Sequence, residues 1–262
     1  MRVFKEIAGH RFFTLDIGAG PLTFFAHSGW VGTNEDWLPT LAVLSRTWPA
    51  VTYDHRGAGE TVVPVEEITG EALVDDVFRV MDALDVERCV LGGFSAGTGV
   101  VLRAVVRHPD RFDGLVLANG TAGVQPPDTA PRAAVPPSAW PGSDHSARMR
   151  WFIERCTPEP DVEHIRCWGH DMLMRAEPDA AERLFGLMPA PDNSLLEHLL
   201  ELRLPTLLIH GSADAFASTA AMNYLTSLIP GSKLIVMEGS GHLPLMIRPH
   251  ETAEAINDYF AR

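Results

Sequence analysis

The chain has 262 residues, of which 46% are hydrophobic and 21% are charged. This is the composition of a globular protein with one large domain or a core domain that carries an insertion, and it excludes a disordered or low-complexity chain. The 34 acidic side chains outnumber the 21 Lys and Arg side chains, and the net charge of −13 has the wrong sign for a nucleic-acid-binding protein. No apolar run reaches the roughly 18 residues of a membrane span, so we expect neither nucleic acid nor a membrane as a partner.

The cysteines and the first residues bear on the compartment. Cys89, Cys156 and Cys167 are odd in number and form no CxxC pair, so we interpret them as reduced thiols. Charged residues come early in the chain, and no apolar stretch with a small-residue cleavage site follows them, so no signal peptide is predicted. These features predict a cytoplasmic protein.

Short runs of β-branched and aromatic residues recur between longer segments of helical period. The predicted strands are 12–17, 22–26, 51–54, 89–92, 115–118, 206–210 and 233–237. The predicted helices between and after them are 35–47, 69–84, 96–107, 218–228 and 250–260. This alternation predicts an α/β fold with a mostly parallel, twisted sheet and helices on both faces, in which the two opening strands pair antiparallel.

The alternation stops between the strands at 115–118 and 206–210. Residues 121–146 contain six prolines, too many for a helix or a central strand, so we expect an ordered loop there. Helices are predicted at 147–156, 161–176, 178–188 and 193–202, with Pro178 in a first helical turn. We therefore expect a core domain made of residues 1–120 and 204–262, and a helical cap inserted at residues 121–203.

The segment Gly93-Phe94-Ser95-Ala96-Gly97 follows a predicted strand and precedes a predicted helix, which is the context that a GxSxG nucleophile elbow requires. A serine on so sharp a turn takes a strained backbone conformation, and side chains at positions 93 and 97 would collide with the adjoining strand and helix. The pattern indicates Ser95 as a nucleophile. The alternative is a Gly- and Ser-rich turn without chemistry.

An acid and a histidine follow Ser95 in the chain order that this elbow requires. Asp214 comes after strand 206–210, at the carboxyl-terminal edge of the sheet, where the binding and catalytic sites of open α/β sheets lie. His242 lies in a flexible loop after strand 233–237. The loop after the preceding predicted strand, 115–118, begins with Asn119, Gly120 and Thr121 and offers no negative charge there. The sequence thus predicts a triad in which His242 takes the proton of Ser95 and Asp214 orients and stabilises the imidazole.

With these motifs, the chain resembles the α/β-hydrolase-fold family over nearly its whole length. The matching stretches are His27-Ser28-Gly29-Trp30, Tyr53-Asp54-His55-Arg56-Gly57-Ala58-Gly59, Gly93 to Gly97, Gly211 to Asp214 and Gly241-His242. The resemblance implies that the segment from Asp54 to Gly59 has a structural role in tying up the loop after its strand.

The resemblance also implies an oxyanion hole made of two backbone amides. One amide belongs to Ala96, directly after the nucleophile, and the other lies in the segment that in the family usually reads His-Gly-x. Because Ser28 stands between His27 and Gly29 here, the register is open by one residue. We favour the amide of Trp30, with Gly29 as the alternative.

Serine at position 95 argues against the family members that use an aspartate nucleophile, namely dehalogenases and epoxide hydrolases. The sequence contains no metal-ligand spacing and no dinucleotide-binding GxGxxG, so no metal and no cofactor are expected. The predicted cap is rich in Trp, Met and Phe, and we expect Phe94, Trp140, Trp151 and Trp168 to contact a small-molecule substrate.

These features predict a serine hydrolase that cleaves a carboxylic ester or lactone of a small to medium, rather apolar substrate through an acyl-enzyme. One alternative is a C–C bond hydrolase that acts on β-diketones or ring-cleavage products with the same triad. A second is a small-molecule receptor on the same fold in which turnover is slow or absent. The intact Ser, Asp and His favour an enzyme.

Overall fold

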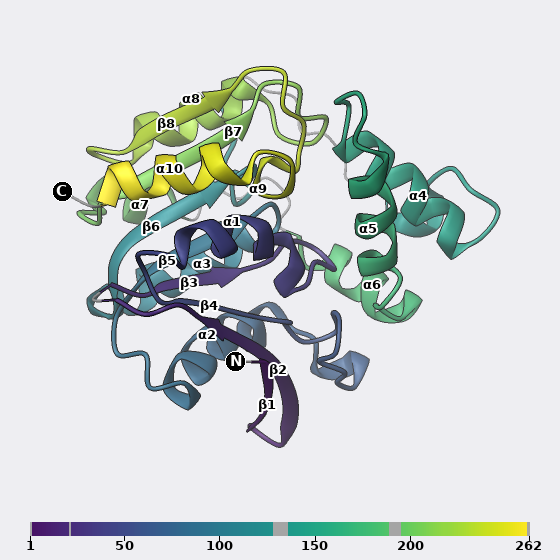
Figure 1. Ribbon diagram of the computed structural model, residues 1–262, viewed down its shortest axis with the longest axis horizontal. Coiled ribbons are helices and arrows are strands. Elements are labelled where there is room, and N and C mark those ends of the chain that lie inside the picture. The colour runs from purple at the N-terminus through teal and green to yellow at the C-terminus, as the bar shows by residue number, and fades with distance from the viewer. Residues whose placement is uncertain (1, 21, 128–135, 189–194, 261–262) are drawn as a thin grey trace.

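The computed structural model describes residues 2–20, 22–127, 136–188 and 195–260. Within them, an 8-stranded sheet has the strand order β1-β2-β4-β3-β5-β6-β7-β8 (Figure 1). The strands are β1 Arg2–Ile7, β2 His10–Ile17, β3 Phe24–His27, β4 Ala50–Tyr53, β5 Cys89–Phe94, β6 Phe112–Ala118, β7 Thr206–Gly211 and β8 Lys233–Met237. From β4 to β8 all neighbours in the sheet run parallel, so the predicted fold class is confirmed.

The predicted pairing of the two opening strands was wrong. β2 pairs antiparallel with β1 and with β4, whereas β3 pairs parallel with β4 and β5. The sequence reading overlooked β1, which lies at the edge of the sheet. Ala8 and Gly9 join β1 to β2 in a two-residue turn, and their φ angles of 50° and 84° suit the twist of a tight hairpin.

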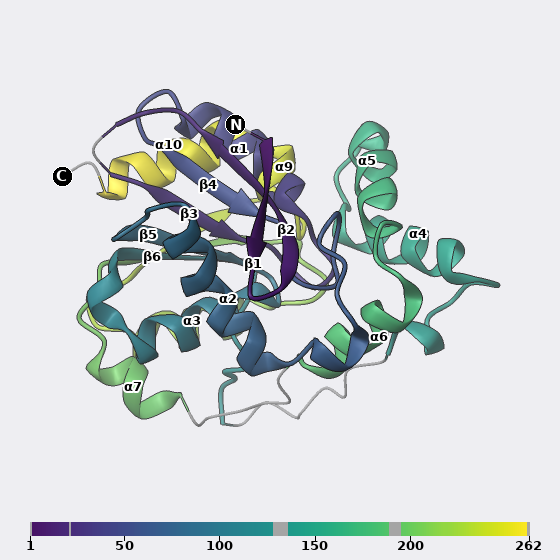
Figure 2. The same ribbon diagram turned by 90° about the horizontal axis from the view of Figure 1, so that it is seen from below.

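Helices cover both faces of the sheet (Figure 2). One face carries α1 (Leu38–Leu44), α9 (Pro244–Ile247) and α10 (Pro249–Phe260), and the other carries α2 (Gly70–Ala83), α3 (Gly97–Arg107) and α8 (Thr219–Leu228). Thr69 and Ser218, each the first residue of a predicted helix, cap α2 and α8 by accepting a hydrogen bond from a backbone amide three residues on.

Two hydrophobic cores result from the alternation of side chains along the central strands. Val90 and Val116 face the core under α1 and α10, whereas their neighbours Leu91 and Leu117 face the core under α2 and α3. Successive residues of a strand point to opposite faces, so a strand buried on both sides is apolar throughout. The ends of these strands are thereby held rigidly at one edge of the sheet.

Between β6 and β7 lie α4 (His145–Cys156), α5 (Glu163–Leu173), α6 (Pro178–Gly186) and α7 (Leu196–Glu201). Pro178 is the first residue of α6, as predicted. In Figures 1 and 2, α4, α5 and α6 lie beyond one end of the sheet, whereas α7 lies away from them. Leu199 of α7 is buried in the core under α2, α3 and α8. These contacts group α7 with the core, although the predicted cap extends to residue 203. Part of the proline-rich loop, residues 128–135, lies outside the described residues.

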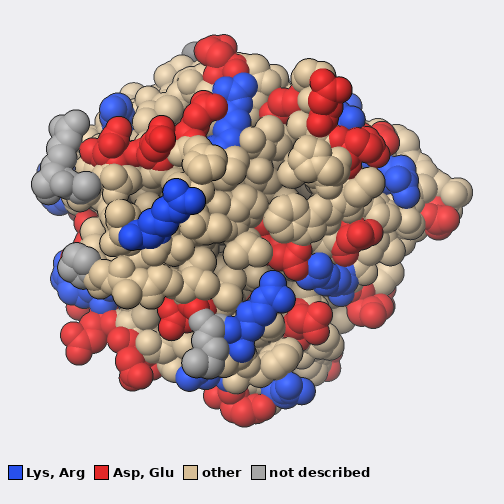
Figure 3. All heavy atoms as spheres, viewed as in Figure 1, with Lys and Arg blue, Asp and Glu red and all other residues tan. Residues whose placement is uncertain are grey.

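The surface carries both signs of charge. On the face shown in Figure 3, Lys and Arg side chains are interspersed with Asp and Glu. None of the helices in the described ranges is long and apolar enough to cross a lipid bilayer.

Candidate active site

Ser95 occupies a sharp turn between β5, which ends at Phe94, and α3, which begins at Gly97. Its φ of 51° is in the left-handed region, which is costly for a residue with a side chain. The turn is held by neighbouring strand β6, because the backbone amide of Ser95 donates to the carbonyl of Ala118 over 2.9 Å. The hydroxyl is thus presented at the carboxyl end of the sheet.

The two glycines of the elbow are required by close approaches. A Cβ at Gly93 would overlap Cγ2 of Val101 in α3, which agrees with the expected collision with the helix. A Cβ at Gly97 would overlap the carbonyl oxygen of Ser28, so at this position the obstacle is the loop after β3 rather than the strand or helix. The elbow therefore packs directly against the segment that was expected to carry the second oxyanion amide.

The structure brings Ser95, His242 and Asp214 into one chain of hydrogen bonds. Nε2 of His242 lies 2.8 Å from Oγ of Ser95, and Nδ1 of His242 lies 2.8 Å from Oδ2 of Asp214. His242 is only 3% exposed, and the side chain of Asp214 is fully buried. With Nδ1–H donating to the carboxylate, Nε2 is the nitrogen free to accept the serine proton.

The carboxylate of Asp214 is kept charged despite its burial. Burial acts to raise the pKa of Asp214, but attraction to His242 and hydrogen bonds from His242, the Phe216 amide and Asn119 outweigh it and lower the pKa. The Phe216 amide donates to Oδ1 over 2.7 Å, so both carboxylate oxygens have partners. A charged Asp214 next to His242 is suited to stabilise an imidazolium.

Sequence reasoning missed the contribution of Asn119, which it considered only as a residue without charge. Asn119 directly follows β6, and its Nδ2 donates to Oδ2 of Asp214 over 2.7 Å and to the carbonyl of Gly241 over 3.2 Å. It therefore connects the loop of the acid with the loop of the histidine. The available signal was its place at the end of a central parallel strand.

The turn after β3 is tied down at Gly29. The Gly29 amide donates to Oδ2 of Asp36 over 3.3 Å, and its carbonyl accepts from Nε2 of His55 over 2.9 Å and from the Gly32 amide over 3.3 Å. Burial raises the pKa of Asp36 to about 7, although the bond from Gly29 and attraction to His242 oppose the shift. Both polar backbone groups of Gly29 are thus engaged within the protein.

The segment after β4 has the structural contacts that the resemblance implied. Asp54 accepts hydrogen bonds from the amides of Asn34 and Glu60, over 2.8 and 2.9 Å. Arg56 is buried and forms a bidentate ion pair with Asp76 of α2, with N···O distances of 2.6 and 2.8 Å. These contacts hold the loops beneath the site.

A small cavity of about 30 Å³ lies next to Ser95 and His242. Apart from Asp36, its other lining side chains are apolar, and they include Phe94 from the elbow and Ile153 and Met172 from the helices above. Phe94 also packs against the ring of His242, with centroids 5.2 Å apart. Of the four residues expected to contact substrate, Phe94 is thus the one that lines this cavity.

The three tryptophans of the predicted cap lie elsewhere. Trp140 stacks on Phe152 with ring centroids 4.9 Å apart and contacts Trp151 on its other side at 5.5 Å, whereas the indole nitrogen of Trp168 donates to the carboxylate of Glu35. None of the three lines the cavity beside Ser95. Their contact with a substrate stays a prediction, and in this structure they serve packing.

Sequence reasoning missed Phe152 and Ile153, which do line the cavity. The signal was present in the period of α4, since Met149, Ile153 and Cys156 recur at helical spacing and are all buried. Trp151 is off this face. Residue size drew attention to Trp151, although helical period decides which side chains face the site.

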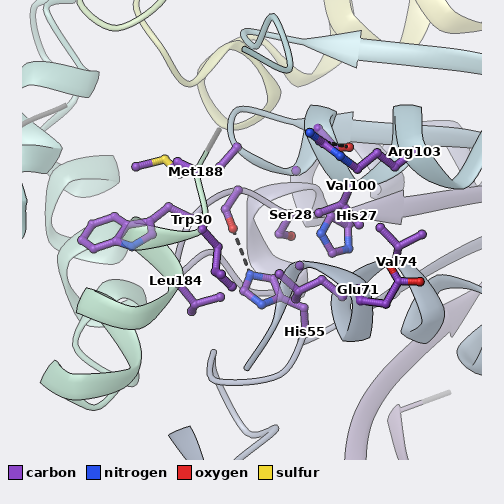
Figure 4. Close-up of a pocket in the computed structure, with 17 residues that line it drawn as sticks. His27, Ser28, Trp30, His55, Glu71, Val74, Val100, Arg103, Leu184 and Met188 are labelled. Carbon is purple, nitrogen blue, oxygen red and sulfur yellow. Dashed lines mark hydrogen bonds between the residues drawn. The ribbon is translucent and has the colours of Figure 1, made fainter. Parts of the chain in front are cut away.

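A second, larger cavity of about 530 Å³ also borders the turn after β3 (Figure 4). His27, Ser28 and His55 line it from the core, and Leu184 and Met188 line it from α6 and the residues that follow. Trp30 and Ala96 border it as well, but Ser95 does not. In the described ranges, no group of three or more His, Cys, Asp or Glu side chains is arranged to hold a metal ion.

Comparison with known proteins places the chain in a family. Residues 23–249 match the family model of the alpha/beta hydrolase fold, so the chain belongs to this family, as its motifs predicted. The chain is 26% identical to 3-oxoadipate enol-lactonase 1 of Acinetobacter baylyi, over 91% of this chain and 88% of that protein. An esterase from Exiguobacterium antarcticum superposes with a TM-score of 0.87 at 22% identity over the full length of both chains, a likeness that shows the fold.

A shorter stretch is more similar to another relative. Over 109 residues the chain is 37% identical to "Putative carbamate hydrolase RutD" of Caulobacter vibrioides. This stretch covers 41% of this chain and 40% of that protein, which is less than half of either.

Proposed function

We propose that this protein is a serine hydrolase that cleaves carboxylic esters or lactones through an acyl-enzyme. The observation that carries the proposal is the continuous chain of hydrogen bonds from Ser95 through His242 to Asp214. A neutral hydroxyl is a weak nucleophile, and an adjacent base that is itself oriented by a carboxylate is the standard way to activate it.

The chemistry follows from this arrangement. Nε2 of His242 takes the proton of Ser95 as Oγ attacks the carbonyl carbon, and the charge on the imidazolium is balanced by Asp214. The same proton then passes from Nε2 to the leaving oxygen, whose bond to the carbonyl carbon breaks, and an ester of Ser95 remains. A water molecule repeats the sequence with His242 as base, which releases the acid and restores Ser95.

We assign the oxyanion hole to the amides of Ala96 and Trp30. The amide of Gly29, the alternative, already donates to Asp36, and this favours the register in which Trp30 supplies the second donor. Amides that point at the developing oxyanion lower the barrier, and the removal of one such donor costs on the order of 3 kcal/mol in related chemistry.

We further propose a small, apolar acyl group for the substrate. The cavity beside Ser95 measures about 30 Å³ and its lining is apolar except for Asp36, so an acyl chain there is short. The enol-lactonase and the esterase to which the chain is similar support cleavage of a lactone or an ester, whereas the short acyl group rests on the cavity alone.

A fluorophosphonate probe tests the nucleophile. It forms a covalent bond with an activated serine, so we expect one adduct on the wild type and none on Ser95→Ala, counted by intact-protein mass spectrometry. Equal labelling of both proteins would reject Ser95. A folded wild type without any adduct would favour the receptor alternative.

A substrate panel tests the reaction. We expect hydrolysis of short-chain esters and small lactones, with turnover abolished in Ser95→Ala. Turnover of a β-diketone or ring-cleavage product alone, with release of two carbon fragments, would replace the proposal by C–C bond hydrolysis with the same triad.

A further inference from the structure

The connection between α4 and α5 lies against the loop that carries His242. The carboxylate oxygen Oε1 of Glu159 accepts hydrogen bonds from the Gly241 amide over 2.6 Å and from the hydroxyl of Ser240 over 3.0 Å. The backbone amide of His242 donates to the carbonyl of Cys156, the last residue of α4, over 2.8 Å. Three consecutive residues, 240–242, are thus bonded to a segment more than 80 positions earlier in the chain.

The fit between these two segments leaves no space. A Cβ at Gly241 would overlap Cδ of Pro158 and crowd the carbonyl oxygen of Cys156, so only glycine allows this approach. Glu159 is buried, with 8% of its surface exposed, and its other oxygen, Oε2, is buried without a hydrogen-bond partner. The Glu159 side chain therefore directs its hydrogen bonding to the histidine loop.

Gly241 is also held through its carbonyl group. Asn119 of the core donates to the Gly241 carbonyl over 3.2 Å, while Glu159 accepts from the Gly241 amide. Both ends of the segment that precedes His242 are therefore fixed by side chains, one from the core and one from the α4–α5 connection. A displacement of about 1 Å at a reacting group costs on the order of 100-fold in rate, so the fixation of this loop matters for proton transfer between Ser95 and His242.

We propose that Glu159 is a positioning residue through which the α4–α5 connection holds His242 in register with Ser95. The proposal rests on the proposed function, because it concerns the base of that reaction. Glu159 acts through the backbone of the loop and contacts neither Ser95 nor the imidazole. It follows that the helices above the site contribute to the placement of the catalytic base as well as to substrate selection.

Replacement of Glu159 by Ala tests the proposal, since it leaves the Gly241 amide and the Ser240 hydroxyl without an acceptor. We expect kcat to fall about 10- to 100-fold with KM within about threefold of the wild type. Glu159→Gln is the conservative variant: its Oε1 accepts both hydrogen bonds, and kcat is expected to stay within a few-fold. Glu163→Ala, which removes an exposed carboxylate at the start of α5, is the matched control and is expected to leave kcat unchanged.

A double-mutant cycle and a spectroscopic signal separate positioning from a general loss of structure. In the Glu159→Ala background, Ser240→Ala is expected to have little further effect on kcat, because the two residues share one hydrogen bond. The downfield proton resonance of Nδ1–H of His242 reports its bond to Asp214, and we expect it to shift or broaden in Glu159→Ala but not in Glu159→Gln. Glu159→Gln also provides a folded protein for these measurements if Glu159→Ala does not fold.

An unchanged kcat in folded Glu159→Ala, a rise in KM alone, or equal damage from Glu159→Gln and Glu159→Ala would each overturn the proposal. Failure of the proposed function is recognised separately, by turnover that persists in Ser95→Ala. In that case the Nδ1–H resonance still decides whether Glu159 positions His242, because it needs no turnover.

Discussion

Asn119 and Asp36 are buried polar residues that support the candidate triad and the turn after β3. Asn119 donates to the same oxygen of Asp214 that accepts from His242, and so keeps this carboxylate in one orientation. Asp36 accepts from the Gly29 amide and lines the cavity beside Ser95. Neither residue belongs to a sequence motif: Asn119 acts on a residue 95 positions later in the chain, and Asp36 acts across the turn after β3.

Asp36 makes the stability of the protein depend on pH. Its pKa is about 7 in the folded protein and about 3.9 for an unfolded aspartate, so between these values the folded state binds the proton that the unfolded state has released. The stability that the neutral Asp36 carboxyl contributes is fully present below about pH 4 and is lost as pH rises through about 7. Between pH 5 and 8 this loss amounts to about 3 kcal/mol.

Asp36→Asn removes this titration. We measure the free energy of unfolding in urea at pH 5 and at pH 8. The decrease between these pH values is expected to be about 3 kcal/mol smaller for Asp36→Asn than for the wild type. Glu66→Gln, which replaces an exposed carboxylate, is expected to follow the wild type. Parallel pH profiles for the wild type and Asp36→Asn would show that Asp36 titrates normally.

At the scale of elements, the site exists because the carboxyl ends of parallel strands meet at one edge of the sheet. The turn after β3, the elbow after β5, and the loops after β6, β7 and β8 supply in turn Trp30, Ser95, Asn119, Asp214 and His242. Hydrogen bonds within and between these loops fix them: the Gly29 amide donates to Asp36 of its own loop, the Gly29 carbonyl accepts from His55 of the loop after β4, and the Gly241 carbonyl accepts from Asn119. The loops therefore form one connected layer above rigid strands.

The ion pair of Arg56 and Asp76 connects the loop after β4 to α2 and is buried on both sides, with side chains 4% and 0% exposed. Asp76→Ala would leave the guanidinium of Arg56 buried without its main partner, and we expect the free energy of unfolding to fall by about 3–5 kcal/mol. Asp75→Ala removes a half-exposed carboxylate on the same helix and is expected to cost about 1 kcal/mol or less. Urea unfolding at pH 7 compares the two, and equal losses would reject a special role of the buried pair.

At the scale of the whole molecule, the inserted helices α4 and α5 contribute side chains to the cavity beside Ser95. Phe152 and Ile153 of α4 reach the cavity beside Ser95, and Phe152 also contacts Phe216 of the loop after β7, with ring centroids 5.0 Å apart. Phe216 in turn packs on His242 at 5.0 Å. Core and inserted helices thus share one aromatic layer around the imidazole.

The size of this enclosed space is expected to set acyl-chain preference. Ile153→Val removes one methylene from the wall, and since one methylene in a fitted pocket is worth about 10-fold or more in discrimination, kcat/KM for a propionyl ester relative to an acetyl ester should rise about 10-fold. Trp151→Phe, a change on the neighbouring residue that does not line the cavity, should leave the ratio unchanged. A larger effect of Trp151→Phe than of Ile153→Val would restore the tryptophans as the substrate contacts.

The sequence by itself determined the fold class and the three residues of the candidate triad. This was possible because the signals are local: strand and helix periods alternate, GxSxG requires its own strand-turn-helix context, and Asp214 and His242 each follow a strand. Parallel strands then leave little freedom, since their carboxyl ends share one edge. The order of the motifs along the chain was therefore enough to predict their meeting in space.

Only the tertiary structure decided which side chains support these residues. The pairing of β2 with β4, the bond from Asn119 to Asp214 and the bond from Gly241 to Glu159 all join segments whose contact no local period encodes. The period of α4 marks Met149, Ile153 and Cys156 as one apolar face, but only the packing of the helix on the core places that face beside Ser95. Side-chain contacts between distant segments depend on the exact placement of two surfaces, and that placement arises only when the whole chain has folded.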